Sequence, residues 1–192
     1  QLVFAENKVQ ELKSKYLALK SFGPKWHFVG YLQTNKVREC ADVAEMIHSV
    51  DRFKLGQALE THLQRAGKSM DILVQVNTSG EASKFGVSPD NAIRLVRDLR
   101  QFETLKIKGL MTLAVFSSES AAVRNCFRQL KVLAGQIRNE GLNRVEMAEL
   151  SMGMSSDYKI AIEEGSTIVR IGQEIFGPRT LPNSYYWDEE KA

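Results

Sequence analysis

Two turns rich in small and polar residues carry the side chains best suited to chemistry. The first turn ends in Ser155, and the second runs from Arg170 through Gly172 to Gln173. Each turn follows a short apolar run that is typical of a strand. A hydroxyl at the start of a helix, exposed backbone N–H groups and a permanent cation together favour an anion. The pattern therefore predicts a site for a phosphorylated ligand.

A purely structural role for these turns is the alternative. Arg170 would then be a buried cation paired with a carboxylate, and Gly172 would only turn the chain. In either case a permanent cation at the end of an apolar strand needs a partner or water. Neither turn matches a strict P-loop or a GxGxxG pattern, so the motif alone leaves both interpretations open.

The histidines and cysteines do not form a recognisable catalytic or metal-binding set. His27, His48 and His62 fall on separate predicted elements without metal-ligand spacing. We expect His27 and His48 to be packed core groups, and His62 to lie on a helix surface. Cys40 and Cys126 are far apart, which favours idle thiols in a reducing compartment over a disulfide.

Composition is that of an ordinary soluble globular protein. Of 192 residues, 43% are hydrophobic and 26% are charged, which is enough for one sizeable core. The net charge of +3 is small and dispersed, so binding to nucleic acid is not supported. No apolar run approaches the length of about 18 residues needed for a membrane span. We expect a cytoplasmic monomer, with the mitochondrial matrix as an alternative compartment.

Strands and helices that alternate along the chain must position the two turns. We predict strands over residues 2–4, 25–30, 46–50, 71–77, 106–112, 145–150 and 167–171, and helices over 8–20, 36–45, 51–63, 88–99, 119–139 and 157–164. Asp51 is expected to cap the third helix, and Gly165 to end the last. Strict alternation gives parallel strands with right-handed crossovers, in an open doubly wound sheet or in a closed barrel.

The number of strands favours the barrel. A (β/α)8 TIM barrel has eight strands, typically in about 250 residues, and the sequence opens at Gln1 directly in a strand-like run without methionine. We therefore expect an α/β protein of this fold whose first strand precedes Gln1. Residues 1–181 would form this single domain, and residues 182–192 an acidic and aromatic surface tail.

Function in a parallel barrel gathers on the loops after the strands. The candidates expected on those loops are Asn7, Gln33, Asn35, Lys36, Asn77, Ser79, Lys84, Met111, Thr112, Ser155 and Arg170. They include no paired carboxylates and no Ser/His/Asp set. Amides, hydroxyls, glycines and one arginine suit a site that holds a phosphorylated ligand rather than one that attacks it.

Several segments carry a family resemblance. They are residues 4–11 (FAENKVQE), 26–36 (WHFVGYLQTNK), 74–81 (VQVNTSGE), 109–112 (GLMT) and 150–177. In order and spacing they resemble the pyridoxal phosphate homeostasis proteins, the YggS/PROSC group of alanine-racemase-like proteins. The resemblance covers nearly the whole chain and implies a fold-type III barrel for pyridoxal 5'-phosphate (PLP), the vitamin B6 cofactor.

The resemblance also implies roles for individual residues. Ser155 and the backbone amides of Gly172 and Gln173 would hold the PLP phosphate, and Arg170 would face the pyridine nitrogen. Asn7 would lie on the loop beside the cofactor. Because an arginine there cannot give up a proton, the ring nitrogen stays unprotonated and the ring is a poor electron sink.

A weak electron sink fits the role that the resemblance implies. That role is a carrier and buffer of PLP in intracellular PLP homeostasis, without established catalytic activity, and PLP-dependent apoenzymes are possible recipients. The alternative is a PLP-dependent amino-acid racemase, which needs a second base on the opposite face of the ring. A phosphosugar-metabolising barrel without PLP is a third hypothesis, with Glu6 as its only modest acid/base candidate.

Two departures from the family pattern concern the amino-terminal segment. The PLP-linking lysine of the family lies upstream of the motif at residues 4–11, so we expect it to precede Gln1. Ala5 and Lys8 stand where the family usually has glycine and tyrosine. Alanine is harmless unless the backbone needs a positive φ, whereas Lys8 could alter contacts near the cofactor edge.

Overall fold

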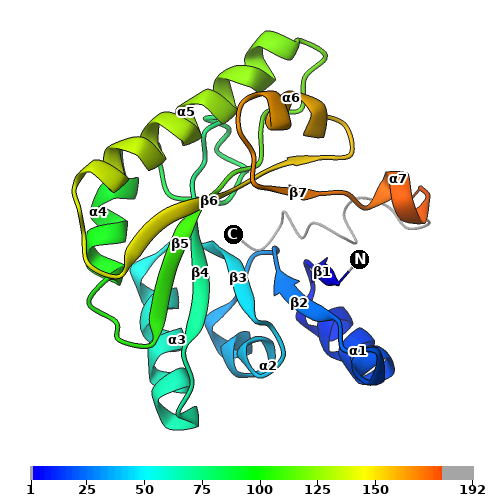
Figure 1. Cartoon of the computed structure of the whole chain (residues 1–192), viewed down its shortest axis with the longest axis vertical. Helices are drawn as coiled ribbons and strands as arrows, with labels where there is room; N and C mark the ends of the chain where they lie inside the picture. The colour runs from blue at the N-terminus through cyan, green and yellow to red at the C-terminus, as the bar shows by residue number, and fades with distance from the viewer. Residues whose placement is uncertain (1, 179–192) are drawn as a thin grey trace.

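A single parallel sheet of seven strands forms the framework of the protein (Figure 1). The computed structural model describes residues 2–178. The strands are β1 (Val3–Glu6), β2 (Lys25–Phe28), β3 (Met46–Val50), β4 (Met70–Gln75), β5 (Leu105–Met111), β6 (Val145–Met154) and β7 (Ile168–Arg170). Each strand pairs in parallel with the next one along the chain.

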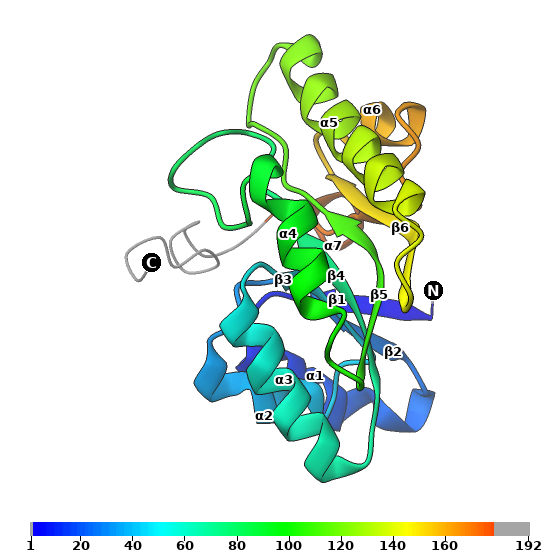
Figure 2. The same cartoon turned by 90° about the vertical axis from the view of Figure 1, so that its left-hand side faces the viewer.

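Helices connect the strands and cover the outer face of the sheet (Figures 1 and 2). They are α1 (Val9–Leu19), α2 (Val37–Ala41), α3 (Phe53–Ala66), α4 (Pro89–Leu99), α5 (Ser120–Asn139), α6 (Tyr158–Glu163) and α7 (Gln173–Phe176), with short 3-10 helices η1 (Lys20–Phe22) and η2 (Thr34–Lys36). In a doubly wound sheet the strand order would reverse at a switch point. Here it follows the chain throughout, so the strands form a nearly closed barrel wall, as predicted.

The hydrophobic core lies between the strands and the surrounding helices. Phe28, Ile47 and Ile72 of the strands are fully buried in it. Leu59 of α3 and Phe127 of α5 are fully buried in the same cluster. Apolar residues spaced along one face of α5, the helix predicted over 119–139, are buried and pack onto the sheet: Val123, Phe127, Leu130 and Leu133.

Helix ends and strand lengths show where sequence and structure differ. The predicted cap at Asp51 is wrong, because Arg52 is the N-cap residue of α3 and has no side-chain cap bond. Asp51 instead accepts a hydrogen bond of 2.6 Å from the Arg52 guanidinium. The helix predicted over 36–45 is shorter and ends at Ala41. Gly165 does end α6, with a φ of +98° that suits glycine.

The amino-terminal strand tolerates the alanine that replaces the family's glycine. Within residues 2–178, positive φ at residues other than glycine occurs only at Arg144 and Met147, so Ala5 is under no such strain. The predicted tail over 182–192 and the predicted domain end at 181 lie outside the described residues. No helix within residues 2–178 combines the length and apolarity that crossing a bilayer requires.

Candidate cofactor-binding site

Ser155 and Arg170 lie side by side at the carboxyl ends of β6 and β7. The two strands pair so that Met154, the residue before Ser155, is opposite Arg170. The turn that follows β6 is closed by Asp157, whose side chain accepts a hydrogen bond of 2.6 Å from the Met154 N–H. Gly153 lets α6 approach, because a Cβ at this position would lie 2.6 Å from the Cβ of Ala161.

Gly172, the N-cap residue of α7, has open space on the side where a Cβ would lie. Its carbonyl accepts bonds from Ile175 and Phe176 at 3.0 and 2.8 Å, and no side chain within residues 2–178 caps the helix. The φ of −117° is accessible to any residue, and a Cβ at Gly172 would meet no atom within 4 Å. Neither strain nor packing therefore requires glycine here, and the space a Cβ would fill is available to a ligand.

Arg170 is a partly buried cation held by neutral oxygen atoms. Its two terminal nitrogens donate hydrogen bonds to Ser151 Oγ at 2.7 Å and to the Thr112 carbonyl at 2.9 Å. Burial lowers the pKa of Arg170 to about 10, and the negative charge of Asp157 opposes this. Within residues 2–178 no carboxylate forms an ion pair with Arg170, so the structural alternative of a carboxylate partner finds no support in the described chain.

Two histidines extend this group of polar side chains. His48 Nδ1 lies 2.9 Å from Ser151 Oγ, and His48 Nε2 lies 3.0 Å from His27 Nδ1. Burial, with the charges of His27 and Arg170, lowers the pKa of His48 to about 2. His48 is therefore a satisfied buried group, as predicted, whereas His27 is satisfied by His48 but only half-buried. His62 lies on α3, where its Nε2 is 2.9 Å from Asp42 Oδ1.

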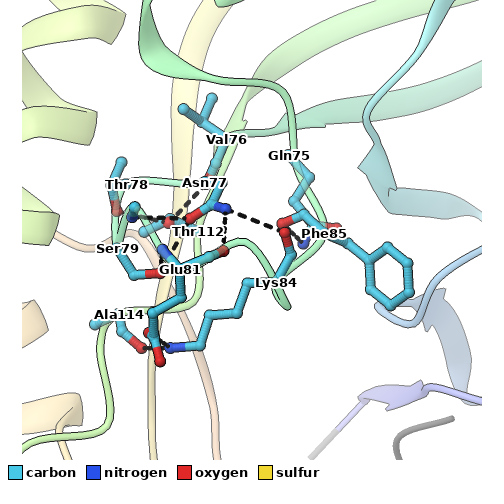
Figure 3. A network of polar contacts seen from close by, with 11 residues as sticks. Gln75, Val76, Asn77, Thr78, Ser79, Glu81, Lys84, Phe85, Thr112 and Ala114 are labelled. Atoms are coloured by element: carbon cyan, nitrogen blue, oxygen red, sulfur yellow. Dashed lines mark hydrogen bonds and ion pairs between the residues drawn. The ribbon is translucent and has the colours of Figure 1, made fainter. Parts of the chain in front are cut away.

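Asn77 organises the loop between β4 and α4 (Figure 3). Its amide nitrogen donates to the carbonyls of Glu81 and Lys84 at 2.8 and 3.1 Å, and its Oδ1 accepts a bond from the Ser79 hydroxyl. Lys84 Nζ donates to the Ala114 carbonyl at 2.9 Å. These three candidates from the sequence thus have structural partners within the loop and its neighbour.

An aromatic contact attaches this loop to the segment that follows β2. The rings of Phe85 and Tyr31 stack with their centroids 4.1 Å apart, and the Arg52 guanidinium carbon lies 4.6 Å from the Tyr31 ring centroid. Gln75 donates a bond of 3.0 Å to the Phe85 carbonyl (Figure 3). The loop is therefore held at both ends rather than left as a free lid.

The structure gathers four of the five predicted site residues at neighbouring strand ends. Ser155, Arg170, Gly172 and Gln173 follow or end β6 and β7. Asn7 follows β1, at the opposite end of the strand order, where its backbone lies against Gly30.

Sequence reasoning included Thr112 among the loop candidates but did not predict which groups contact the arginine. Arg170 donates directly to Ser151 Oγ and to the Thr112 carbonyl, and His48 reaches the arginine only through Ser151. The one signal in the sequence was the pair His48-Ser49 inside an otherwise apolar strand, because polar side chains in a buried strand need hydrogen-bond partners.

Fold and site together define the class: a parallel β/α barrel with a candidate anion site at the carboxyl ends of its strands. The chain belongs to the alanine racemase N-terminal domain family, whose profile matches residues 3–180, and within it to the pyridoxal phosphate homeostasis proteins. The protein of that name from Aquifex aeolicus is 41% identical over 177 residues, covering 92% of this chain and 77% of the relative. The one from Pseudomonas aeruginosa is 39% identical over 176 residues, covering 92% and 74%.

Solved structures agree with this assignment. PipY of Synechococcus elongatus without PLP superposes with a TM-score of 0.87 at 33% identity, over 92% of this chain and 82% of PipY. PipY with PLP bound gives a TM-score of 0.85 at 32% identity over the same shares. Alanine racemase of Clostridium difficile 630 is only 12% identical, with a TM-score of 0.74 over 94% of this chain and 46% of the racemase. That last likeness concerns the fold alone.

Proposed function

We propose that this protein binds PLP and acts in intracellular PLP homeostasis as a carrier and buffer of the cofactor, without catalytic activity of its own. The observation that carries the proposal is a partly buried guanidinium bonded to neutral oxygens beside an open turn at Gly172. Such a cation gains from a ligand that offers an acceptor or a negative charge. The names of the relatives and the PLP-bound structure of PipY support the choice of PLP.

The donors present suit the polar groups of PLP. The Ser155 hydroxyl and the backbone N–H groups of Gly172 and Gln173 would hold the phosphate, because hydrogen bonds to an anion are strong. Arg170 would donate to the pyridine nitrogen, and Asn7 would lie at the edge of the ring. When bound, PLP supplies a reactive aldehyde and a ring that can accept electrons. Arg170 would keep the ring a weak electron acceptor, because it leaves the pyridine nitrogen unprotonated.

The alternative functions have less support. A racemase would need a second base on the opposite face of the PLP ring, and none of the five proposed site residues is such a base. For a phosphosugar enzyme the candidate carboxylate was Glu6, which forms an ion pair with Lys15 of α1. That contact directs Glu6 toward the covering helix instead of the strand-end site.

The compartment and partners also belong to the proposal. Both cysteines are free and buried, and burial raises the pKa of the Cys40 thiol to about 12. Inert thiols are compatible with a reducing cytoplasm, and equally with the mitochondrial matrix. We propose a monomer that transfers PLP to PLP-dependent apoenzymes.

Substitution of Gly172 by alanine tests the phosphate site. The new methyl group meets no protein atom within 4 Å, so G172A should fold with unchanged stability. It would occupy the space assigned to the phosphate and weaken PLP binding roughly 10- to 100-fold, the value of about one charge-assisted hydrogen bond. Binding is measured by absorbance titration with PLP and with pyridoxal, which lacks the phosphate.

A matched control distinguishes this effect from a general one. A Cβ at Gly135 in α5 would likewise meet no atom within 4 Å, so G135A should bind PLP like wild type. G172A should lose affinity for PLP and not for pyridoxal. Equal PLP affinity of G172A and wild type would contradict the phosphate assignment. Turnover of D- or L-amino acids by the PLP-loaded protein would favour the racemase.

A further inference from the structure

Four side chains form a continuous hydrogen-bonded chain from β2 to β7. His27, His48, Ser151 and Arg170 are joined by distances of 3.0, 2.9 and 2.7 Å. Strands β4 and β5 separate β3 from β6 in the sheet. The contact of His48 with Ser151 therefore crosses the interior of the barrel rather than passing along its wall.

The chemistry of the arginine fixes the direction of these hydrogen bonds. A guanidinium can only donate, so Ser151 Oγ accepts from Arg170. The single hydroxyl proton of Ser151 then has His48 Nδ1 as its acceptor. His48 Nδ1 must carry a lone pair, which places the ring proton on Nε2, from where it is donated to His27 Nδ1.

The opposite direction leaves a polar group unsatisfied. If His48 donated from Nδ1, Ser151 Oγ would accept two bonds, and within residues 2–178 its own proton would have no acceptor. A buried hydroxyl without an acceptor is costly. The low pKa of His48, caused by burial and by the nearby charges, agrees with a neutral ring.

The chain also restricts the arginine. Ser151 and the Thr112 carbonyl hold the two terminal nitrogens of Arg170, so the guanidinium plane is fixed by two acceptors. A serine hydroxyl alone can rotate. The bond to His48 removes that freedom, since it directs the hydroxyl proton away from Arg170.

We propose that His48, acting through Ser151, is a positioning residue that aims Arg170 at the PLP ring, and that His27 keeps His48 in the required tautomer. This inference rests on the proposed function. It assigns a role to three residues in the interior of the barrel, none of which needs to touch the cofactor.

The tautomers can be measured on the protein without PLP. Long-range ¹H–¹⁵N correlation spectra distinguish a protonated from an unprotonated imidazole nitrogen, and H48N and H27N assign the signals. We expect His48 to be neutral with its proton on Nε2, and His27 Nδ1 to be unprotonated. A His48 proton on Nδ1, or a charged His48 at neutral pH, would overturn the proposal.

Binding of a PLP analogue tests the effect on Arg170. In the analogue carbon replaces the ring nitrogen, so it offers Arg170 no acceptor. Wild type should prefer PLP over the analogue, and S151A and H48L should each reduce this preference about tenfold. The double variant should lose no more than either single one, because both interrupt the same chain. H48N retains an acceptor near the Nδ1 position and should restore the preference.

The outcomes separate this inference from the proposed function. A purely structural role for His48 would weaken binding of PLP and analogue equally and leave the preference intact, which would overturn the inference. Wild type that binds both ligands equally would also overturn it while leaving PLP binding in place. Failure of wild type to bind PLP at all would refute the proposed function and the inference with it.

Discussion

Acid should destabilise this protein through His48. The side chain is 1% exposed and its pKa is about 2, against 6.5 for an ordinary histidine. Below pH 6.5 the unfolded chain binds a proton at this position that the folded chain does not, so stability falls as the pH falls. Well below pH 6.5, one such group lowers the free energy of unfolding by about 1.4 kcal/mol per pH unit. At pH 5 the loss relative to pH 7.5 is about 2 kcal/mol.

Two other groups also contribute to the pH dependence of the free energy of unfolding. Burial lowers the pKa of His27 and acts in the same direction. Burial raises the pKa of Asp51 above 3.8, so the stability this group adds is present at low pH and is lost as the pH rises. A comparison of variants at the same pair of pH values separates His48 from Asp51, while His27 is coupled to His48 through their hydrogen bond.

Urea unfolding at pH 7.5 and pH 5, at constant ionic strength, measures the effect. From pH 7.5 to pH 5 the free energy of unfolding of wild type should fall by about 2 kcal/mol more than that of H48N. For a typical urea slope this is a difference of about 1 M in the shift of the unfolding midpoint. S151A is the matched control, because it breaks the same chain without removing a titratable group. It should be less stable at both pH values and keep the full pH dependence.

Equal pH dependence of wild type and H48N would refute the reasoning. It would mean that folded protein accepts the proton on His48, and hence that the interior of the barrel tolerates a second cation near Arg170.

Two further substitutions should destabilise the fold, and a third should not. A Cβ at Gly30 would lie 2.0 Å from the Asn7 carbonyl oxygen, so G30A should cost about 3 kcal/mol or more, measured by urea unfolding. Glu60 is buried and accepts bonds from the two backbone N–H groups just before β5, so E60A should cost about 3 kcal/mol in the same assay. Arg97 forms an exposed ion pair with Glu140, and R97A should leave the unfolding midpoint unchanged.

The sequence predicted the arrangement of the barrel because that information is local. Apolar runs and amphipathic helices alternate strictly, and parallel strands then bring their carboxyl ends to one edge. The same pattern predicted that Ser155 and Arg170 lie at adjacent strand ends. The pairing of Met154 with Arg170 confirms that the two residues are neighbours.

The sequence could not predict the interior chain of hydrogen bonds. His48 and Ser151 are 103 residues apart and lie on strands that do not pair. The register of both strands shifts at these positions, between Ile47 and Val50 and between Ser151 and Met154, so alternation does not tell which side chains point inward. Residues 151–154 (Ser-Met-Gly-Met) were predicted to form a turn because of their small residues, although they continue β6.

The contact between His48 and Ser151 has a consequence for folding. It can form only after the strands between these residues are in place, and contacts of such long sequence separation form late, because closing a long loop is entropically unfavourable. Arg170 acquires its orientation from that contact. The preference for the ring nitrogen of the cofactor is therefore a property of the completed barrel, and a chain still being assembled would not yet have it.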